Sequence, residues 1–292
     1  MPKKTKNNYQ IFSEAFPPDK RGIRKKLYPS SSTHSLLEGI KINPEEIIYK
    51  PLTKENIEEI KNLHKEWFPI DYSERFFEKL FDKDNYWCFT IGAFYNFLDK
   101  EKNEKKEIIL GLALCEWIPI NDYFIKHTSK EAVHEICKNI NYKEEVETYL
   151  KCEEYRCVYI MTIGVLDEFR KMKIGSHILN EIINVALMDN LCVGVSLDVI
   201  YYNYSAIKFY KKNNFKKVST IKNYYNLNGT KYDSYVFLRI LTRKEKDDFR
   251  AKNSNILQKI LNILILNPIN FVVKIILYLL LFQCFKNKIK IE

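Results

Sequence analysis

The amino-acid sequence predicts an α/β fold with one compact core between residues 46 and 242. A nearly continuous apolar run at 157–165 is typical of a strand that is buried on both faces. Residues 174–190 follow it with apolar side chains at helical spacing, and a second apolar strand is predicted at 193–200. Strands that alternate with helices in this way indicate the α/β class.

The predicted elements before this segment begin with a strand at 47–52 and a helix that Thr53 caps. This helix is expected to end near Trp67, and Ser73 is expected to cap the next one. The remaining elements are predicted to be a helix at 75–81, strands at 86–96 and 107–117 around a solvated hairpin tip at 99–107, an inserted surface excursion at 120–154, a helix at 205–213, and strands at 215–227 and 232–241.

Basic charge is concentrated at the two ends of the chain. The net charge is +10, residues 1–27 carry eight basic residues against two acids, and residues 243–292 carry ten against four. A nucleic-acid-binding domain normally carries its basic face on the folded body, so this distribution argues against nucleic acid and favours an anionic membrane surface. The alternative is that both ends are solvated tails without a partner. Residues 1–45 are predicted to be a flexible basic arm.

The composition excludes a disordered chain and a disulfide-rich one. Hydrophobic residues make up 46% and charged residues 29%, which is enough apolar material for a sizeable core. The seven cysteines are an odd number without a CxxC pair, and the first residues lack the apolar stretch of a signal peptide. We therefore expect reduced thiols in a cytosol-facing protein, with no disulfide framework and no metal site.

Residues 243–292 are predicted to form amphipathic membrane-anchoring helices. The polar residues of 255–266 fall on one helical face, and Asn267-Pro268 then breaks the helix. Residues 269–285 are strongly apolar, but seventeen helical residues span only roughly 25 Å of a hydrocarbon core that is roughly 30 Å thick. Helices that lie in the plane of the membrane are therefore favoured, with a tilted span and a helical partner surface as alternatives.

A basic turn after the strand that ends at Val165 is the first candidate site. It contains Arg170, Lys171 and Lys173, and Gly175 lies in the first turn of the following helix. A helix N-terminus presents free N–H groups and the positive end of the helix dipole, and both favour a phosphate group. Basic turns also occur without any ligand, so the turn alone leaves both interpretations open.

The run from Val158 to Phe215 resembles the acetyl-CoA-binding half of the GNAT acetyltransferases. The family turn reads Arg/Gln-x-x-Gly-x-Gly/Ala, and residues 170–176 read RKMKIGS. The segment SLDVIYYNYSAIKFYKKNNF at 196–215 is similar to the family's second signature. The positions in place are Asn203, Ala206, Tyr210 and Phe215. The resemblance implies the GNAT fold, in which helices flank a central mixed and mostly antiparallel sheet.

Three segments also resemble the Golgi-associated, NatF-type N-alpha-acetyltransferases, which are described as histone acetyltransferases as well. They are WFPIDYS at 67–73, VYIMTIGVLDEFRKMKIGS at 158–176 and the Tyr224-Tyr225 pair. That family also ends in amphipathic membrane helices. The resemblance covers about residues 50–242 and the character of the C-terminal segment, and it leaves out the arm, the hairpin tip and the excursion.

The resemblance implies a role for each of several residues. Acetyl-CoA would be the co-substrate, and the residues that hold it would be Ile163, Gly164, Val165, Arg170, Lys171, Met172, Lys173, Ile174, Gly175, Ser176, Asn203 and Tyr210. The residues that line the first residue of the acceptor peptide would be Tyr72, Met161, Tyr224 and Tyr225. Tyr159 would be the base and would act on the amine through a water molecule.

The sequence departs from the family pattern at two positions. Lys173 stands where the first glycine of the turn is expected, and Asp198 stands where the family has its second catalytic residue, a histidine. An α-amine has a pKa near 8, so a sizeable fraction of it is already neutral at pH 7. The reaction therefore needs only modest help from a general base. Asp198 is assigned to the catalytic pair with Tyr159, where it could accept a proton through a water molecule, orient Tyr159, or anchor the substrate ammonium group.

These residues predict an enzyme that moves acetyl from acetyl-CoA to the N-terminal amine of Met-starting membrane proteins by direct attack. The resemblance implies the cytosolic face of the Golgi membrane, with another endomembrane as the alternative. Two other functions stay open: a GNAT enzyme that acetylates lysine side chains, histones or small amines, and a membrane-bound adaptor that binds acetyl-CoA without catalysis. The three tyrosines of the peptide slot favour a peptide end, whereas Asp198 keeps the adaptor open.

Overall fold

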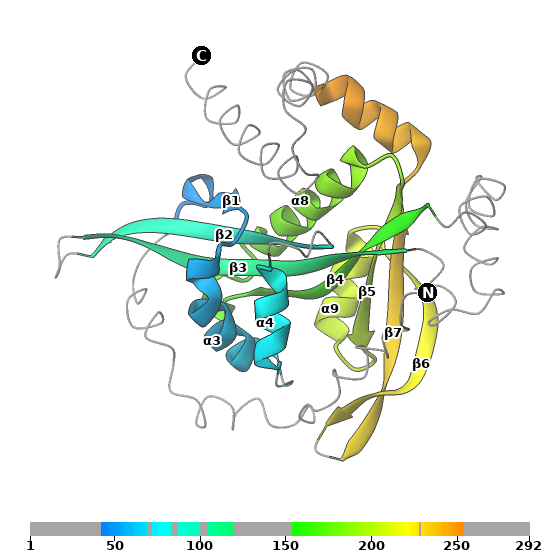
Figure 1. The fold of residues 1–292 in the computed structure, drawn as a ribbon, viewed down its shortest axis with the longest axis horizontal. Helices are drawn as coiled ribbons and strands as arrows, with labels where there is room; N and C mark the ends of the chain where they lie inside the picture. The colour runs from blue at the N-terminus through cyan, green and yellow to red at the C-terminus, as the bar shows by residue number, and fades with distance from the viewer. Residues whose placement is uncertain are drawn as a thin grey trace.

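The computed structural model describes residues 42–68, 70, 72–82, 87–99, 104–119, 154–227 and 229–253 (Figure 1). These residues comprise most of the core that the sequence predicts. Nearly all of the predicted arm at 1–45, nearly all of the excursion at 120–154, and the predicted helices after residue 253 lie outside them.

Seven strands form one mixed sheet in the order β1-β2-β3-β4-β5-β7-β6. The bounds of β1 to β7 are Ile48–Lys50, Cys88–Asp99, Glu104–Pro119, Arg156–Val165, Cys192–Ile200, Lys216–Leu227 and Thr230–Ile240. Neighbouring strands are antiparallel except for β4 and β5, which are parallel. This topology confirms the predicted α/β class and the predicted mixed, mostly antiparallel sheet.

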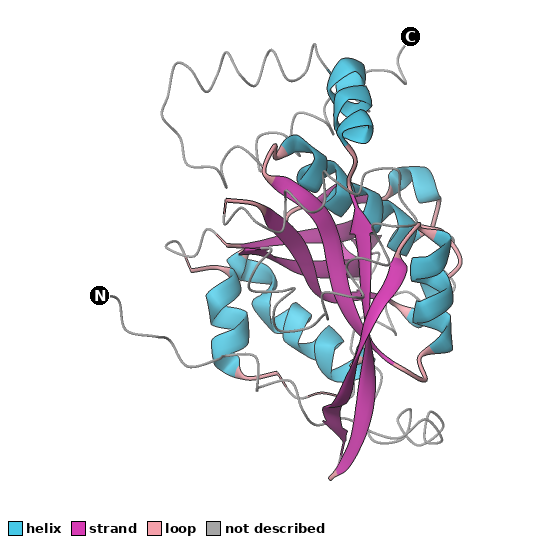
Figure 2. Ribbon diagram, turned by 90° about the vertical axis from the view of Figure 1, so that its right-hand side faces the viewer, coloured by secondary structure: helices cyan, strands magenta, loops and turns pink. Residues whose placement is uncertain are grey.

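Helices cover both faces of the sheet (Figure 2). Their bounds are Ile57–Trp67 for α3, Glu74–Leu80 for α4, Ile174–Met188 for α8 and Tyr204–Lys212 for α9, with short 3-10 helices at Pro44–Glu46 (η3), Lys54–Asn56 (η4) and Asp167–Phe169 (η5). On one face, His64 of α3 contacts Thr162 of β4. On the other, Ile178 of α8 lies beside Gly111 of β3. We call these two sides the α3 face and the α8 face.

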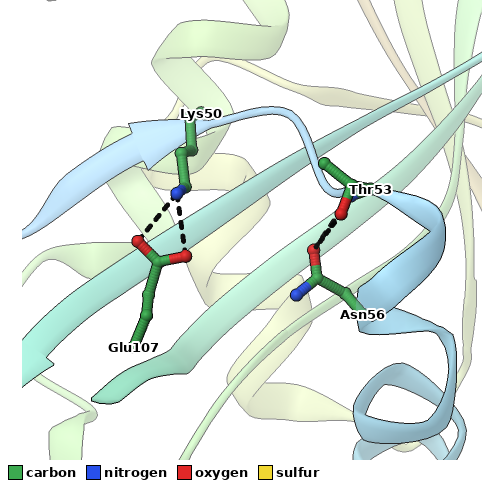
Figure 3. A network of polar contacts seen from close by, with 4 residues as sticks. All are labelled: Lys50, Thr53, Asn56 and Glu107. Atoms are coloured by element: carbon green, nitrogen blue, oxygen red, sulfur yellow. Dashed lines mark hydrogen bonds and ion pairs between the residues drawn. The ribbon is translucent and has the colours of Figure 1, made fainter. Parts of the chain in front are cut away.

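Polar contacts fix the first strand and the start of α3 (Figure 3). The Thr53 N–H donates to Asn56 Oδ1 at 2.9 Å, and the Thr53 hydroxyl donates to the same oxygen at 3.3 Å. The first turn is the 3-10 helix η4, so the regular helix begins at Ile57 rather than directly after the predicted cap. Lys50 Nζ donates to both carboxylate oxygens of Glu107 at 2.7 and 2.8 Å, and this ion pair ties β1 to β3 across β2.

The strands β2 and β3 extend into the segment that the sequence predicts as a hairpin tip at 99–107. Asp99 is the last paired residue of β2 and Glu104 is its partner at the start of β3. The tip is therefore shorter than expected. Glu104, Lys105 and Glu107 are exposed, and an antiparallel ladder of backbone hydrogen bonds does not require apolar side chains.

The strands β4 and β5 diverge in the middle of the sheet. Their pairing ends at Ile160 and Leu197, although β4 continues to Val165 and β5 continues to Ile200. Met161 is the extra residue of a β-bulge on β4 at the same point. Bulges bend and twist the strand that carries them. The bulge therefore turns the second half of β4 away from β5, and the facing edges of the two strands share no hydrogen-bond ladder there.

A helix at 243–253 follows β7 directly (orange in Figure 1). The Thr242 N–H donates to Glu245 Oε2 at 2.9 Å, and the Glu245 N–H donates to Thr242 Oγ1 at 3.1 Å. These reciprocal bonds form a capping box, which satisfies two amide groups at the helix start. Among the helices that the structure describes, none combines the length and the apolarity needed to cross a bilayer.

The helix at 243–253 packs against the core, so the core ends later than the sequence predicts. Lys246 is only 6% exposed and its Nζ donates to the Asn190 carbonyl at 3.0 Å. Arg250 also donates to the Asn190 side chain, and Phe249 packs against the main hydrophobic cluster. Residues 243–253 therefore pack with the core, although the sequence analysis counts them with the predicted membrane segment.

Candidate active site

The turn before α8 contains two lysines with a backbone conformation that favours glycine. Lys171 and Lys173 both have left-handed backbone conformations, with φ of 69° and 64°. Lys173 is the position at which the glycine of the family pattern is missing. Glycine adopts such a φ without strain, whereas another residue does so at a modest cost. Lys173 thus has a conformation that glycine would also adopt, and it adds a positive side chain to the turn.

The start of α8 combines free amide groups with positive charge. The Lys173 carbonyl accepts the His177 N–H at 3.0 Å, so the N–H groups of residues 174–176 precede the first helical hydrogen bond. Lys171 and Lys173 are exposed beside them. Arg170 instead forms an ion pair of 2.6 Å with a neighbouring carboxylate, that of Asp167. The two lysines and the helix end together suit a phosphate group.

The predicted cofactor residues differ in exposure. Ile163, Val165 and Met172 are half-buried and pack against the main hydrophobic cluster. Ile174 is 1% exposed and is itself a core residue. Its side chain holds α8 against the sheet, so only its backbone can reach a ligand at the turn.

Two glycines of this region have different surroundings. A Cβ atom on Gly164 would lie 2.1 Å from a ring carbon of Trp67 in α3. A Cβ atom on Gly175 would find no neighbour closer than 3.6 Å, at Val165. Packing within the protein therefore requires glycine at position 164, whereas the protein leaves room for a side chain or a ligand at position 175.

Tyr159 and Asp198 meet where β4 and β5 diverge. The Tyr159 hydroxyl donates to Asp198 Oδ2 at 3.0 Å. Tyr159 opposes Glu116 of β3, and Lys79 of α4 donates to Glu116 at 2.9 Å, so Tyr159 lies on the side of the sheet that α3 and α4 cover. The structure therefore brings the two predicted catalytic residues together, and the carboxylate fixes the orientation of the phenol.

Tyr72 and Tyr225 lie next to this pair. Burial raises the pKa of Tyr225 well above its ordinary value, and the neighbouring groups of Asp198, Tyr224 and Tyr72 contribute to the rise. Burial also raises the pKa of Tyr72. The Tyr224 and Tyr225 rings are perpendicular, with centroids 4.9 Å apart. Tyr225 thus lies near the carboxylate and near two other predicted substrate residues, Tyr72 and Tyr224, and the phenols of Tyr72 and Tyr225 stay protonated at neutral pH.

Asp233 fixes the segment of β6 that carries Tyr225. The β6–β7 register shifts just before Tyr225 and leaves residues 222–224 as a bulge opposite Asp233. Lys222 Nζ donates to one Asp233 oxygen at 2.7 Å, and the Asn223 N–H donates to the other at 3.0 Å. These two bonds hold the pKa of Asp233 below its ordinary value. Sequence analysis missed Asp233, because no local pattern marks a residue that acts across a strand pair.

His64 joins α3 to β4 beside Tyr72, and sequence analysis missed this role too. It is 1% exposed, and its ring nitrogens contact the Ile60 carbonyl at 2.8 Å and the Thr162 hydroxyl at 3.1 Å. A carbonyl can only accept, so Nδ1 carries the proton and Nε2 accepts from Thr162. The surrounding rings are Phe68, Tyr72, Phe76 and Phe77. The ring thereby fixes α3 and the neighbouring Tyr72, a predicted substrate residue, to the bulged strand.

The free energy of unfolding is expected to decrease as the pH is lowered from 6.5 to about 4, because of His64. Burial lowers the pKa of His64 from 6.5 to about 4, so in this window the unfolded chain binds a proton that the folded chain rejects. This one group is expected to remove about 3 kcal/mol from the free energy of unfolding. His64→Phe should flatten that part of the pH profile, measured by urea unfolding at pH 7, 5.5 and 4.5.

The control for this measurement is the exposed His177. His177→Gln should keep the pH dependence of the wild type, because it leaves the buried His64 in place and changes only an exposed side chain of α8. If His64→Phe retains the full slope, another group causes it and His64 is protonated in the folded protein.

Asn203 and Tyr210 have structural positions in α9. The Asn203 side chain accepts the Ala206 N–H at 3.2 Å and the Ser205 hydroxyl at 3.0 Å, so Asn203 caps the helix. Tyr210 is 7% exposed and its ring packs against Phe237. The fold itself accounts for both residues, and their contacts with a cofactor stay predictions.

The thiols in the described part of the chain are buried. They are Cys88, Cys115, Cys157 and Cys192, and none of these four is in a disulfide. Burial raises the pKa of Cys115 and Cys157, and it raises the pKa of Cys192 to about 12. These three thiols are therefore protonated and are not placed to act as nucleophiles. Within the described ranges, His, Cys, Asp and Glu side chains form no group of three or more that could hold a metal ion.

Two curated relatives cover about two thirds of the chain. Histone acetyltransferase MCC1 of Arabidopsis thaliana is 25% identical over 201 residues, which are 68% of this chain and 72% of the relative. N-alpha-acetyltransferase 60 of Xenopus tropicalis is 27% identical over 199 residues, which are 66% of this chain and 69% of the relative.

The fold also matches solved structures. Arabidopsis thaliana NAA60 in complex with a bisubstrate analogue has a TM-score of 0.52 and 24% sequence identity, over 66% of this chain and 97% of that one. The same protein in complex with acetyl-CoA has a TM-score of 0.51 and 24% identity, over 67% of this chain and 98% of that one.

The family model described as the acetyltransferase (GNAT) family matches residues 57–215. This range is more than half of the chain. It contains the divergence of β4 and β5, the basic turn before α8, and the Tyr159–Asp198 pair. The chain belongs to the GNAT acetyltransferase family.

Proposed function

We propose that this chain is an N-alpha-acetyltransferase, which moves an acetyl group from acetyl-CoA to the N-terminal amine of a protein that begins with Met. The observation that carries the proposal is the hydrogen bond of 3.0 Å between Tyr159 and Asp198, at the point where β4 and β5 diverge. The names of two relatives support the choice of acceptor, since one is N-alpha-acetyltransferase 60 and one solved structure is NAA60.

The residues around the divergence fit acetyl-CoA as the second substrate. The diphosphate would lie at the start of α8, where Lys171 and Lys173 are exposed and where the backbone of Gly175 is accessible. The pantetheine arm would follow the edge of β4 from Val165 toward the bulge, because that edge has no ladder with β5. This path ends beside Tyr159.

The reaction needs one bond to form, one to break and one proton to move. The neutral α-amine attacks the carbonyl carbon of the thioester, the C–S bond breaks, and the amine proton is passed on as coenzyme A leaves as the thiol. A water molecule passes this proton to the Tyr159 hydroxyl, whose own proton moves to Asp198 Oδ2, and the same relay then returns a proton to the departing sulfur. The Tyr225 phenol stays protonated and is a hydrogen-bond donor at the site.

The surroundings favour a Met side chain at the first residue of the acceptor. Tyr225 lies near both the Asp198 carboxylate and Tyr72, and the rings of Tyr72 and Tyr225 are half-buried. A thioether sulfur makes favourable contacts with aromatic rings, and the unbranched side chain of Met adapts to the space between them. A lysine side chain fits this space less well, because its four apolar carbons would lie between Tyr72 and Tyr225 and would carry a charged amine at their end.

Transfer of labelled acetyl from acetyl-CoA to three matched peptides tests the proposal. The first begins with a free Met, the second has the same sequence with a blocked N-terminus and one internal lysine, and the third begins with Asp. Label on the first alone is expected. Label on the second would indicate a lysine acetyltransferase, and acetyl-CoA binding without any transfer would indicate a non-catalytic adaptor.

The location at the cytosolic face of the Golgi membrane, or of another endomembrane, is part of the proposal. Its support is the sequence after residue 253, in which apolar stretches at 255–266 and 269–285 are followed by basic residues. The acceptors would then be the cytosolic N-termini of membrane proteins.

Two truncations are expected to separate membrane binding from folding. Ending the chain after Asn253 removes the proposed membrane segment only, so the protein should move to the soluble fraction and keep its peptide acetylation. Ending it after Thr242 also removes the helix at 243–253 and the contacts of Lys246 and Arg250 with Asn190, so this variant should melt at a lower temperature. Fractionation, thermal melting and peptide acetylation measure the three outcomes.

Alkaline carbonate treatment of the full chain on membranes discriminates the two membrane arrangements. Extraction is expected for helices that lie in the plane of the membrane, and resistance would indicate a span. A shorter variant that stays on membranes after loss of residues 254–292 would contradict the anchor.

A further inference from the structure

Lysines are concentrated in one part of the folded body. Between Asp198 and Asp233 the sequence contains seven lysines and no acidic residue, and four of the seven lie in the run KKNNFKK at 211–217. We call these four the lysine surface. All four are exposed, and they are Lys211 and Lys212 at the end of α9 and Lys216 and Lys217 at the start of β6. Sequence analysis missed this surface, because acids elsewhere in the core offset its charge in the total.

The charges of these lysines lie close enough to affect one another. Lys217 Nζ lies 3.5 Å from the centre of the Tyr235 ring. Burial lowers the pKa of Lys217, the nearby charges of Lys222 and Lys211 lower it further, and only Asp233 opposes this change. Asp233 is itself bonded to Lys222 at 2.7 Å. The lysine surface therefore has an excess of positive charge, which favours an anionic partner.

The lysine surface lies where α9 ends and β6, the last strand of the sheet, begins. Lys216 opposes Leu238 of β7. The chain reaches Thr242, which caps the helix at 243–253, four residues after Leu238. Four extended residues span about 13 Å. The lysine surface is therefore close to the start of the last helix that the structure describes.

That helix is attached to the body and does not project from it. Lys246 Nζ donates to the Asn190 carbonyl at 3.0 Å, Arg250 donates to the Asn190 side chain, and Phe249 packs against the main hydrophobic cluster. The helix ends at residue 253, and the apolar stretch at 255–266 begins two residues later. The proposed membrane segment thus starts directly at the body, without a spacer that would keep the body away from a bilayer.

We propose that the lysine surface contacts the headgroups of an anionic bilayer and thereby orients the folded body on the membrane. The proposal goes beyond the proposed function and rests on its membrane location. An apolar segment together with a basic patch binds a membrane more stably than either signal alone. At physiological ionic strength four lysines are too weak to retain the body by themselves, so the surface adds to the membrane segment and does not replace it.

A surface made of lysines alone suits lipid headgroups better than a nucleic acid. Arg binds phosphate groups at two points and is favoured in nucleic-acid recognition, whereas Lys is a point charge that needs no fixed geometry. Residues 199–232 contain no Arg. Tyr225 lies nine residues after Lys216 in β6, which corresponds to about 25–30 Å along the strand. Contact with lipid at the lysine surface therefore leaves the peptide slot uncovered.

Binding of the full chain to two kinds of vesicle tests the surface. One kind contains phosphatidylcholine alone, and the other also contains phosphatidylserine. The wild type should prefer the anionic vesicles. Substitution of all four lysines should lower this preference about 20-fold, since each lysine near an anionic surface strengthens binding about 5-fold at most. The variant carries Lys211→Gln, Lys212→Gln, Lys216→Gln and Lys217→Gln. It should keep the wild-type Tm and the acetylation of a soluble Met-starting peptide.

A control variant loses the same charge from other elements. It carries substitutions of four lysines that are also exposed, namely Lys54→Gln, Lys65→Gln, Lys105→Gln and Lys231→Gln. The control should keep the wild-type preference for anionic vesicles to within about 2-fold. An equal loss of preference in both variants would mean that only the net charge matters, and it would overturn the lysine surface.

Amine-reactive labelling of the wild type measures the contact without any substitution. The four lysines of the surface should react several-fold more slowly on anionic vesicles than in solution, whereas the four control lysines should react at the same rate in both. Unchanged rates at the lysine surface overturn it while the membrane location stands. Protection by RNA and not by vesicles assigns the surface to nucleic acid and also overturns it. A wild type that binds neither kind of vesicle overturns the membrane location itself.

Discussion

Tyr159→Phe is expected to lower kcat by about 10²–10⁴ and to leave the KM of acetyl-CoA unchanged. The substitution keeps the ring and removes the hydroxyl that donates to Asp198 at 3.0 Å. The sheet should be unaffected, because the Tyr159 side chain is half-buried and its ring remains. Steady-state kinetics with a Met-starting peptide measure the effect, and thermal melting checks that the variant is folded.

Asp198→Asn distinguishes a proton acceptor from an anchor. The amide keeps the shape of the side chain and removes the charge. If Asp198 accepts the proton, kcat should fall and the acidic limb of the pH–rate profile should move. If Asp198 only binds the ammonium group, the KM of the peptide should rise while kcat holds at saturation. The Tyr159–Asp198 hydrogen bond favours the first outcome.

The two substitutions together report whether the residues act as a unit. Because each side chain orients the other, the combined variant should lose little more kcat than Tyr159→Phe alone. Fully multiplicative losses would mean that the two residues act independently. Unchanged activity in both single variants would leave an amine that loses its proton to solvent alone.

Gly164→Ala and Gly175→Ala are expected to have opposite effects, although both add one methyl group. A Cβ atom on Gly164 would lie 2.1 Å from the Trp67 ring, so the variant must displace α3 from β4 and should lose about 3 kcal/mol of stability. For a core of this size, that loss corresponds to a fall in Tm of about 6–12 °C. At Gly175 the nearest atom is 3.6 Å away, so the protein accepts the methyl group and Tm should hold or rise.

The affinity for acetyl-CoA is expected to fall in the Gly175→Ala variant, whose Tm should hold or rise. Gly175→Ala adds a methyl group where the diphosphate is proposed to lie, so the Kd of acetyl-CoA in calorimetry should rise about 10-fold or more, since a methyl group opposes close approach of the backbone. A Gly175→Ala variant with wild-type affinity would place the diphosphate elsewhere.

Sequence reasoning was most reliable where a feature depends on the order of the chain. The apolar run at 157–165 and the helical spacing at 174–190 predicted β4 and α8 to within two residues. The resemblance to the family also paired Tyr159 with Asp198, and the structure places the two side chains within hydrogen-bond distance. Their catalytic roles stay predictions.

Features that depend on contacts between distant segments were missed. In the sequence, His64 is one of five histidines, and none of them lies at the family's catalytic position. In the structure, His64 is 1% exposed and contacts Thr162, which is ninety-eight residues later in the chain. Asp233 acts on a bulge in a different strand. The helix at 243–253 contacts Asn190, and its polar composition gave no sign that it packs on the core. In each case, the partner cannot be identified without the fold.

The divergence of β4 and β5 also bears on how the sheet holds together. The paired register between these strands runs only from Arg156–Cys192 to Ile160–Leu197, so one short seam joins a four-stranded half to a three-stranded half. A molecule bound between the free edges contacts both halves at once. Its binding free energy then adds to the free energy of unfolding, so a higher concentration of acetyl donor is expected to stabilise the folded enzyme against separation of the two halves.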